Sequence, residues 1–144
     1  GKNRKGYMES HTRDRDGKKF ETAIGGHRII TDQPASGGGT DAGVTPLELL
    51  LASLGSCAAH YAVEYLRARS LPLTGLEIRA YAEKGTYPGR LALFRIEVDA
   101  GVMDEKHRRG LLRAVKGCIV HNTLTTGSVI EVEIAAPKPL QRTA

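Results

Sequence analysis

The stretch from Thr45 to Ser70, TPLELLLASLGSCAAHYAVEYLRARS, constrains the fold of this chain more than any other. Thr45 can cap a helix that begins at Pro46, and Glu48, at the third helical position, completes a capping box. The following residues are apolar around most of the helix, with no charge between Glu48 and Glu64. A helix that is apolar on nearly every face must be covered, so the sequence predicts a long, buried central helix.

Before this helix, the pattern predicts three short antiparallel strands. Asp16-Gly17 is a hairpin turn signal between strands expected at about 4–12 and 18–24, and a third strand is expected at 27–31. The glycine-rich segment 33–43 then forms a loop. Its glycines precede no Gly-Lys-Ser/Thr, so a phosphate-binding interpretation has little support.

After the central helix, alternating apolar and polar residues predict a hairpin with strands at 76–83 and 94–99. Helices are expected at 104–116 and 118–125, and a final strand at 130–134, where isoleucines and valine alternate with glutamates. Strands, helix, strands, helices and a last strand indicate an α+β fold with antiparallel sheets around the buried helix.

Length and charge narrow the class of protein. The 144 residues predict a single domain over 1–144 with its core at about 18–135. The net charge of +5 comes without basic residues interleaved with aromatic ones, and aromatic residues make up only 5%, so no nucleic-acid partner is expected. Serine and glycine break the longest apolar stretch, so no membrane span is expected. Two cysteines form no disulfide scaffold, which favours a reducing cytoplasm.

The two cysteines are the candidate reactive groups. Cys57 lies among small residues in the central helix, and Cys118 lies at the start of a predicted helix, where free amides lower a thiol pKa. The two thiols are either buried structural cysteines or a redox pair. A third interpretation is a Cys2His2 zinc site, because His60 and His121 each follow a cysteine by three residues and share its helix face.

Two segments carry a resemblance to a known family. GGGTDAGVTPLELLLASLGSC, followed about 60 residues later by GCIVHNTL, resembles the OsmC/Ohr family of osmotically inducible and organic-hydroperoxide-resistance proteins, in particular its OsmC-like branch. The resemblance covers about residues 18–135 and implies the OsmC-like fold in an intertwined homodimer. It also implies thiol-dependent reduction of organic hydroperoxides without a cofactor. By that resemblance Cys57 is the peroxidatic thiol and Cys118 resolves its sulfenic acid as a disulfide, which an external dithiol of lipoyl or thioredoxin-like type reduces.

The sequence departs from the family pattern at two positions. The family glutamate directly after the proline is replaced by Leu47, and Glu48 is the nearest acid. Nine residues separate Glu48 from Cys57, which puts the two side chains on opposite sides of a straight helix. The residue after the second cysteine is Ile119, where the family usually has proline.

The family also uses an arginine from its N-terminal strands to stabilise the thiolate. Arg28 is our choice, because it lies on a short strand just before the glycine loop, whereas Arg13 and Arg15 flank a turn. The candidate catalytic set is therefore Cys57, Cys118, Glu48 and Arg28. The alternative to catalysis is a dimeric domain of the same fold that binds a small apolar ligand between its subunits.

Overall fold

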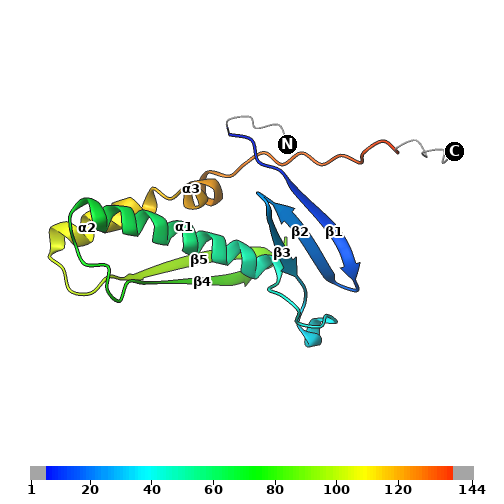
Figure 1. Ribbon diagram of the computed structural model, residues 1–144, viewed down its shortest axis with the longest axis horizontal. Coiled ribbons are helices and arrows are strands. Elements are labelled where there is room, and N and C mark those ends of the chain that lie inside the picture. Colours follow the sequence, from blue (N-terminus) through cyan, green and yellow to red (C-terminus); the bar gives the residue numbers. More distant parts are fainter. Residues whose placement is uncertain (1–5, 138–144) are drawn as a thin grey trace.

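The computed structural model describes residues 6–137 (Figure 1). Its elements in chain order are β1 (Ser10–Asp16), β2 (Lys19–Ile24), β3 (His27–Thr31), the short 3-10 helix η1 (Ala35–Gly37), α1 (Pro46–Ala68), β4 (Glu77–Gly85), β5 (Arg90–Asp99), α2 (Glu105–Lys116) and α3 (Ile119–Thr126). The strands form two antiparallel sheets, β1-β2-β3 and β4-β5. The α+β class is confirmed.

The N-terminal sheet, β1-β2-β3, forms where the turn signals predict it, but its first strand was placed wrongly. The strand expected at 4–12 spans Ser10–Asp16 instead, and residues 4 and 5 lie outside the described residues. The reason is the hairpin register: Asp16 pairs with Lys19 and Ser10 with Ile24. A two-residue turn requires both strands to run up to it, so β1 must end beside the turn rather than four residues before it.

Helix α1 begins with the predicted capping box. The Glu48 amide donates to Thr45 Oγ1 at 3.2 Å, and the Thr45 amide donates to Glu48 Oε1 at 3.0 Å. Pro46 occupies the first helical position, where a missing N–H costs no intrahelical hydrogen bond. The helix runs for 23 residues along the β4-β5 hairpin, and α2 packs beside it (Figure 1).

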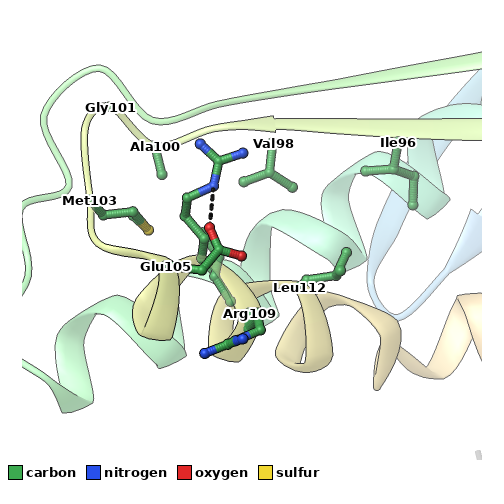
Figure 2. A pocket seen from close by; sticks show the side chains of 10 residues that line it. Ile96, Val98, Ala100, Gly101, Met103, Glu105, Arg109 and Leu112 are labelled. Atoms are coloured by element: carbon green, nitrogen blue, oxygen red, sulfur yellow. Dashed lines mark ion pairs between the residues drawn. The ribbon is translucent and has the colours of Figure 1, made fainter.

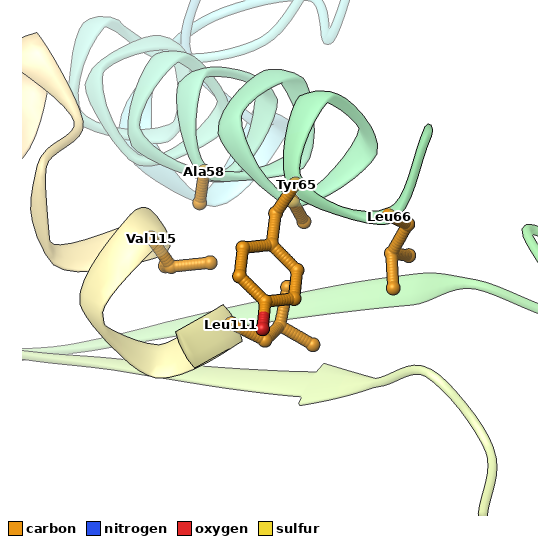
Figure 3. Packing of buried hydrophobic residues seen from close by; sticks show 6 residues of the cluster. Ala58, Tyr65, Leu66, Leu111 and Val115 are labelled. Atoms are coloured by element: carbon orange, nitrogen blue, oxygen red, sulfur yellow. The ribbon is translucent and has the colours of Figure 1, made fainter. Parts of the chain in front are cut away.

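The core lies where α1, α2 and the β4-β5 hairpin meet. Figure 3 shows Tyr65 and Leu66 of α1 directed into the same space as Leu111 and Val115 of α2. Ala58 and Ala62 are fully buried there, which lets α2 approach α1 closely. Apolar side chains from the inner face of the hairpin complete the cluster, namely Leu76, Ile78, Ile96 and Val98.

The prediction that α1 is buried on nearly every face is wrong for a single chain. Only five of its residues are buried: Leu54, Ala58, Ala62, Tyr65 and Leu66. Leu47 and Leu50 remain 43% and 37% exposed, because the hairpin and α2 cover one side of the helix only. By length and composition alone α1 qualifies to cross a membrane, a test that core helices of soluble proteins also pass.

The final strand predicted at 130–134 is absent from the described residues. The chain from Gly127 to Pro137 has no regular structure, and Ile130, Val132 and Ile134 are 84%, 87% and 94% exposed. Alternation marks a segment suited to a half-buried strand, but a strand also needs the edge of a neighbour for its hydrogen bonds. Among residues 6–137 of one chain, this segment pairs with no such edge.

The glycine-rich loop wraps around one buried carboxylate. Asp32 is 1% exposed and accepts hydrogen bonds from the Thr40 hydroxyl at 2.7 Å, the Gln33 amide at 2.8 Å and the Ala42 amide at 3.1 Å. A Cβ at Gly39 would collide with the carbonyl oxygen of Gln33. The glycine therefore allows the loop to close on Asp32, which accounts for the glycines without any phosphate.

Candidate functional site

Cys118 caps the N-terminus of α3. Gly117 ends α2, and Cys118 then takes an extended conformation with its Sγ accepting the His121 amide at 3.5 Å. A capping residue satisfies one of the amides that a helix leaves free in its first turn. The side chain of Cys118 is fully buried. The helix start therefore fixes this sulfur in place.

Cys57, in the middle of α1, lies near the start of α3. It lies three residues after the buried Leu54 and directly before the buried Ala58, and its own side chain is half-buried. The side chain of Cys118 and the amides of Ile119 and Val120 lie near enough to Cys57 to shift the pKa of its thiol. Both cysteines are free thiols. The structure thus brings together the two thiols that the sequence separates by about 60 residues.

The environment shifts the two thiol pKa values in opposite directions. Burial raises the pKa of Cys57, but the hydrogen bond with Cys118 and the amides of Val120 and Ile119 outweigh it, so the pKa lies below its ordinary value. Burial is the largest cause of the raised pKa of Cys118, and the neighbouring Cys57 raises that pKa further. The lowered pKa favours the thiolate form of Cys57, and the raised pKa favours the protonated thiol of Cys118.

This result corrects the expectation that free amides lower the Cys118 pKa. The amides of His121 and Val120 do act in that direction on Cys118, but burial and Cys57 outweigh them. The amides at the start of α3 help to lower the pKa of Cys57, whose side chain approaches them from α1. Sequence alone shows which helix begins at Cys118 but not which sulfur lies over its first amides.

Ile119, where the family usually has proline, is the first residue of α3. Proline has no N–H, so a proline here could not donate to Cys57. Ile119 supplies that donor, and its amide is one of the causes of the lowered Cys57 pKa. The departure from the family pattern therefore adds an N–H donor near the Cys57 sulfur.

Glu48 is engaged in the α1 cap. Its pKa is lowered by the Thr45 amide and then by the Thr45 hydroxyl. Nine residues correspond to about 13 Å along the helix axis between Glu48 and Cys57. Glu48 does line an open apolar groove of about 420 Å³ that extends along α1 as far as Ser56, next to Cys57. Its catalytic role stays a prediction.

The candidate arginines all lie in the N-terminal sheet. Arg28 pairs with Glu21 at 3.5 Å and its side chain is 77% exposed, and Arg15 pairs with the same glutamate. No arginine of the described chain is among the groups that shift the Cys57 pKa. The assignment of Arg28 to the thiolate is not tested by this single chain and stays a prediction.

The histidines do not join the cysteines in a metal site. His60 faces outward and pairs with Glu64 at 3.4 Å, with its side chain 65% exposed. His121 lies 3.4 Å from the Asn122 side chain. Among residues 6–137, no three His, Cys, Asp or Glu side chains converge as ligands. Because a structural zinc site needs four ligands around one point, the Cys2His2 interpretation does not hold for these residues.

An apolar cavity of about 500 Å³ lies between β5, α2 and α3 and reaches the α1 residue Leu54. Its walls are mostly aliphatic and aromatic, with Phe94 and Leu124 among them, and His121 and Lys116 contribute its polar groups. Leu54 precedes Cys57 by one helical turn, and His121 donates its amide to Cys118. The cavity therefore borders the residues that hold the two thiols.

Comparison with known proteins assigns the chain to a family. A family profile described as OsmC-like protein matches residues 38–133, which include both cysteines. The chain belongs to the OsmC-like protein family. No curated protein matches the sequence significantly.

Solved structures support the OsmC-like fold of the chain at low sequence identity. A protein provisionally assigned to the osmotic-stress and detoxification response of Psychrobacter arcticus is 20% identical, with a TM-score of 0.72 over 82% of this chain and 88% of that one. An OsmC-like protein from Mycoplasma pneumoniae is 21% identical, with a TM-score of 0.66 over 82% and 86%. An organic hydroperoxide resistance protein OsmC from Legionella pneumophila is 12% identical, with a TM-score of 0.60 over 83% and 89%.

Proposed function

We propose that this OsmC-like protein reduces organic hydroperoxides with Cys57 and Cys118. The observation that carries the proposal is that Cys57 and Cys118 lie close together at the start of α3, with pKa values shifted in opposite directions. A peroxidatic cysteine must be ionised, and a resolving cysteine must lie within reach of it. The lowered pKa of Cys57, caused first by Cys118 and then by the amides of Val120 and Ile119, favours the thiolate and supports the first role. The nearby Cys118 side chain supports the second.

The reaction follows from the roles of the two sulfurs. The Cys57 thiolate attacks the terminal oxygen of ROOH, the O–O bond breaks, and RO⁻ leaves and takes up a proton. Cys57 is then a sulfenic acid. Cys118 attacks its sulfur, releases water and forms a Cys57–Cys118 disulfide. An external dithiol, of lipoyl or thioredoxin-like type, returns both thiols to the reduced state by exchange.

An apolar substituent on the hydroperoxide fits the surroundings of the thiols. The cavity of about 500 Å³ is bounded by Leu54 and His121, each three residues from one of the cysteines, and is lined mainly by side chains such as Phe94 and Leu124. Water-excluding walls of this kind favour a hydrocarbon-bearing peroxide over hydrogen peroxide. The substrate class we assign is therefore organic hydroperoxides rather than H₂O₂.

We further propose that the working form is a homodimer. Leu47 and Leu50 of α1 are exposed, and the alternating residues 130–134 have no neighbouring strand. The N-terminal sheet lies beyond one end of α1 rather than on it (Figure 1). A second copy that covers these apolar surfaces would supply the burial that the composition of α1 predicts. It would also supply a second N-terminal sheet, from which Arg28 can act on a thiolate.

The deciding experiment measures consumption of cumene hydroperoxide and of hydrogen peroxide by the purified protein with dihydrolipoamide. We expect turnover of cumene hydroperoxide at a higher kcat/KM than hydrogen peroxide. Cys57→Ser should abolish it, whereas Cys118→Ser should allow one stoichiometric oxidation of Cys57. Absence of turnover, together with a Cys57 that titrates above about 8.5, the unperturbed thiol value, would reject the proposal. Binding of a small apolar ligand in the cavity would then be the better assignment.

A further inference from the structure

Four cations form a stripe along α2. Lys106, Arg109, Arg113 and Lys116 follow one another at spacings of three, four and three residues, and all four are exposed. At about 100° per residue, these positions fall within about 80° of the helix circumference. The basic stripe, as we call these four residues, is therefore a single line of positive charge about 15 Å long.

The basic stripe faces away from the core and has no internal counter-charge. Leu111 and Val115 are buried on the opposite side of α2. Figure 2 shows Arg109 projecting away from β5, on the far side of the helix from the strand. Among residues 6–137, Glu105 pairs with Arg108 at 3.8 Å, outside the stripe, and no stripe residue forms an ion pair.

The C-terminal end of the basic stripe lies next to Cys118 in the chain. Its last member, Lys116, precedes Cys118 by two residues and lines the apolar cavity together with His121, whose amide donates to Cys118. A partner aligned along the stripe would thus have one end at the point where the Cys57–Cys118 disulfide forms. Because Cys118 is fully buried, a reductant must be held at this point for long enough to react.

We propose that the basic stripe docks an acidic protein that carries the dithiol reductant. This inference rests on the proposed function of the thiols. One thiolate of the carrier attacks the Cys57–Cys118 disulfide to form a mixed disulfide and release one thiolate of this chain, and the carrier's second thiol then displaces the other. Two electrons and two protons pass from the carrier to this chain, and the carrier leaves as a disulfide.

A protein partner fits the stripe better than a nucleic acid does. α2 carries no Phe, Tyr or Trp on which bases can stack, and its His107 ring packs against Tyr65. The stripe instead suits an acidic surface, because complementary charge accelerates association by about 10- to 1,000-fold at low salt. The accelerated step here is re-reduction of the disulfide, whereas attack on the hydroperoxide needs no docked protein.

The test measures re-reduction of the preformed disulfide by quenched flow, with thiol alkylation and mass spectrometry as the readout. One reductant is a strongly acidic lipoylated domain in its reduced form, and the other is free, uncharged dihydrolipoamide. The variant Arg109→Glu/Arg113→Glu reverses the middle of the stripe. The control Lys84→Glu/Arg95→Glu makes the same change of net charge at exposed positions of β4 and β5.

We expect the stripe variant to react about tenfold more slowly with the lipoylated domain at low salt, and at the parent rate with dihydrolipoamide. Added salt should slow the parent and leave the variant nearly unchanged. An equal loss in the control, or an equal loss with both reductants, overturns the proposal. An unchanged reduction rate with loss of duplex DNA binding would assign the stripe to nucleic acid.

The disulfide can be formed with diamide as well as with cumene hydroperoxide, which separates the two proposals. If only diamide forms it, the proposed peroxidase function fails while docking is still measured. If both reagents form it and the stripe variant behaves like the parent, the docking inference fails and the peroxidase function stands.

Discussion

The Tyr65 hydroxyl occupies the space in which any side chain at Gly110 would lie. A Cβ built on Gly110 collides with the Tyr65 hydroxyl and ring. That hydroxyl lies 3.3 Å from His107 Nδ1, and Arg69 lies over the Tyr65 ring with 3.7 Å between its guanidinium carbon and the ring centroid. A glycine in the middle of α2 is thus required by the close crossing of α1 and α2, despite its low helix propensity.

Gly110→Ala should destabilise the protein. The added methyl group must displace Tyr65 and its contacts, and overpacking of this kind costs about 1–3 kcal/mol, more than the gain in helix propensity. Thermal or urea unfolding measures the loss. Gly89→Ala is the control, because a Cβ there meets nothing within 4 Å. If the two variants unfold at the same midpoint, Tyr65 does not pack tightly against Gly110.

Ile119→Pro should raise the Cys57 pKa. Proline is tolerated at the first position of a helix but removes the N–H that donates to the Cys57 sulfur. Loss of one hydrogen bond to a charged group corresponds to about a tenfold smaller thiolate fraction. Alkylation of Cys57 near pH 7 by iodoacetamide, in a Cys118→Ser background, reports the change. Ile119→Val keeps the amide and should react like its parent.

Arg28→Ala tests the assignment of the thiolate-stabilising cation. If a second copy brings Arg28 to Cys57, its removal should slow alkylation of Cys57 near pH 7 by about tenfold or more. Arg13→Ala is the control, because that side chain lies on the exposed strand β1. An unchanged alkylation profile in Arg28→Ala would leave the amides of α3 as the source of the lowered Cys57 pKa.

Acid should loosen the glycine-rich loop between about pH 4 and pH 2. The Thr40 hydroxyl and then the Gln33 amide lower the pKa of Asp32 to about 2. A carboxyl group with a lowered folded-state pKa adds stability above its unfolded value of about 3.9, and this stability is lost as pH falls through the folded value. Hydrogen exchange of the Ala42 amide follows the transition. Asp32→Asn should weaken the loop at pH 7 and remove its pH dependence.

The protein should be a dimer in solution, as expected from α1. Leu50→Lys places a charge on the exposed apolar face of α1 and should shift light scattering toward the monomer mass. Val102→Lys is the control, because Val102 is fully exposed in a loop and a charge there meets only solvent. A parent protein that remains a monomer at micromolar concentration would contradict the dimer.

Local chemistry accounts for the part of the fold that could be predicted from sequence. The capping box of Thr45 and Glu48 and the Asp16-Gly17 turn each involve neighbours in the chain, so their residues suffice to locate them. The exposed face of α1 and the unpaired segment 130–134 could not be anticipated, since both depend on whether another surface is present. Their apolar patterns indicate burial but do not name the element that provides it.

The candidate site was predictable to a similar extent. The spacing and setting of Cys57 and Cys118 predict a pair of thiols. They do not predict which of the two thiols has the lower pKa. Which thiol is ionised depends on the approach of α1 to the first amides of α3, and that is a tertiary relationship. His60 shows that spacing alone can also mislead. Its i, i+3 spacing from Cys57 predicts that the two residues could bind one metal ion, but its imidazole pairs with Glu64 at the surface.

The meeting of Cys57 and Cys118 also has a consequence for the chain as a polymer. When the proposed disulfide forms, it closes a ring of about 60 residues that contains β4, β5 and α2. Closing a ring of that size restricts the unfolded chain and stabilises the folded one by about 4 kcal/mol in the loop-entropy treatment. Each turnover would then alternate a ring-closed, more heat-resistant molecule with an open, less resistant one. The melting temperature of the protein would report its redox state.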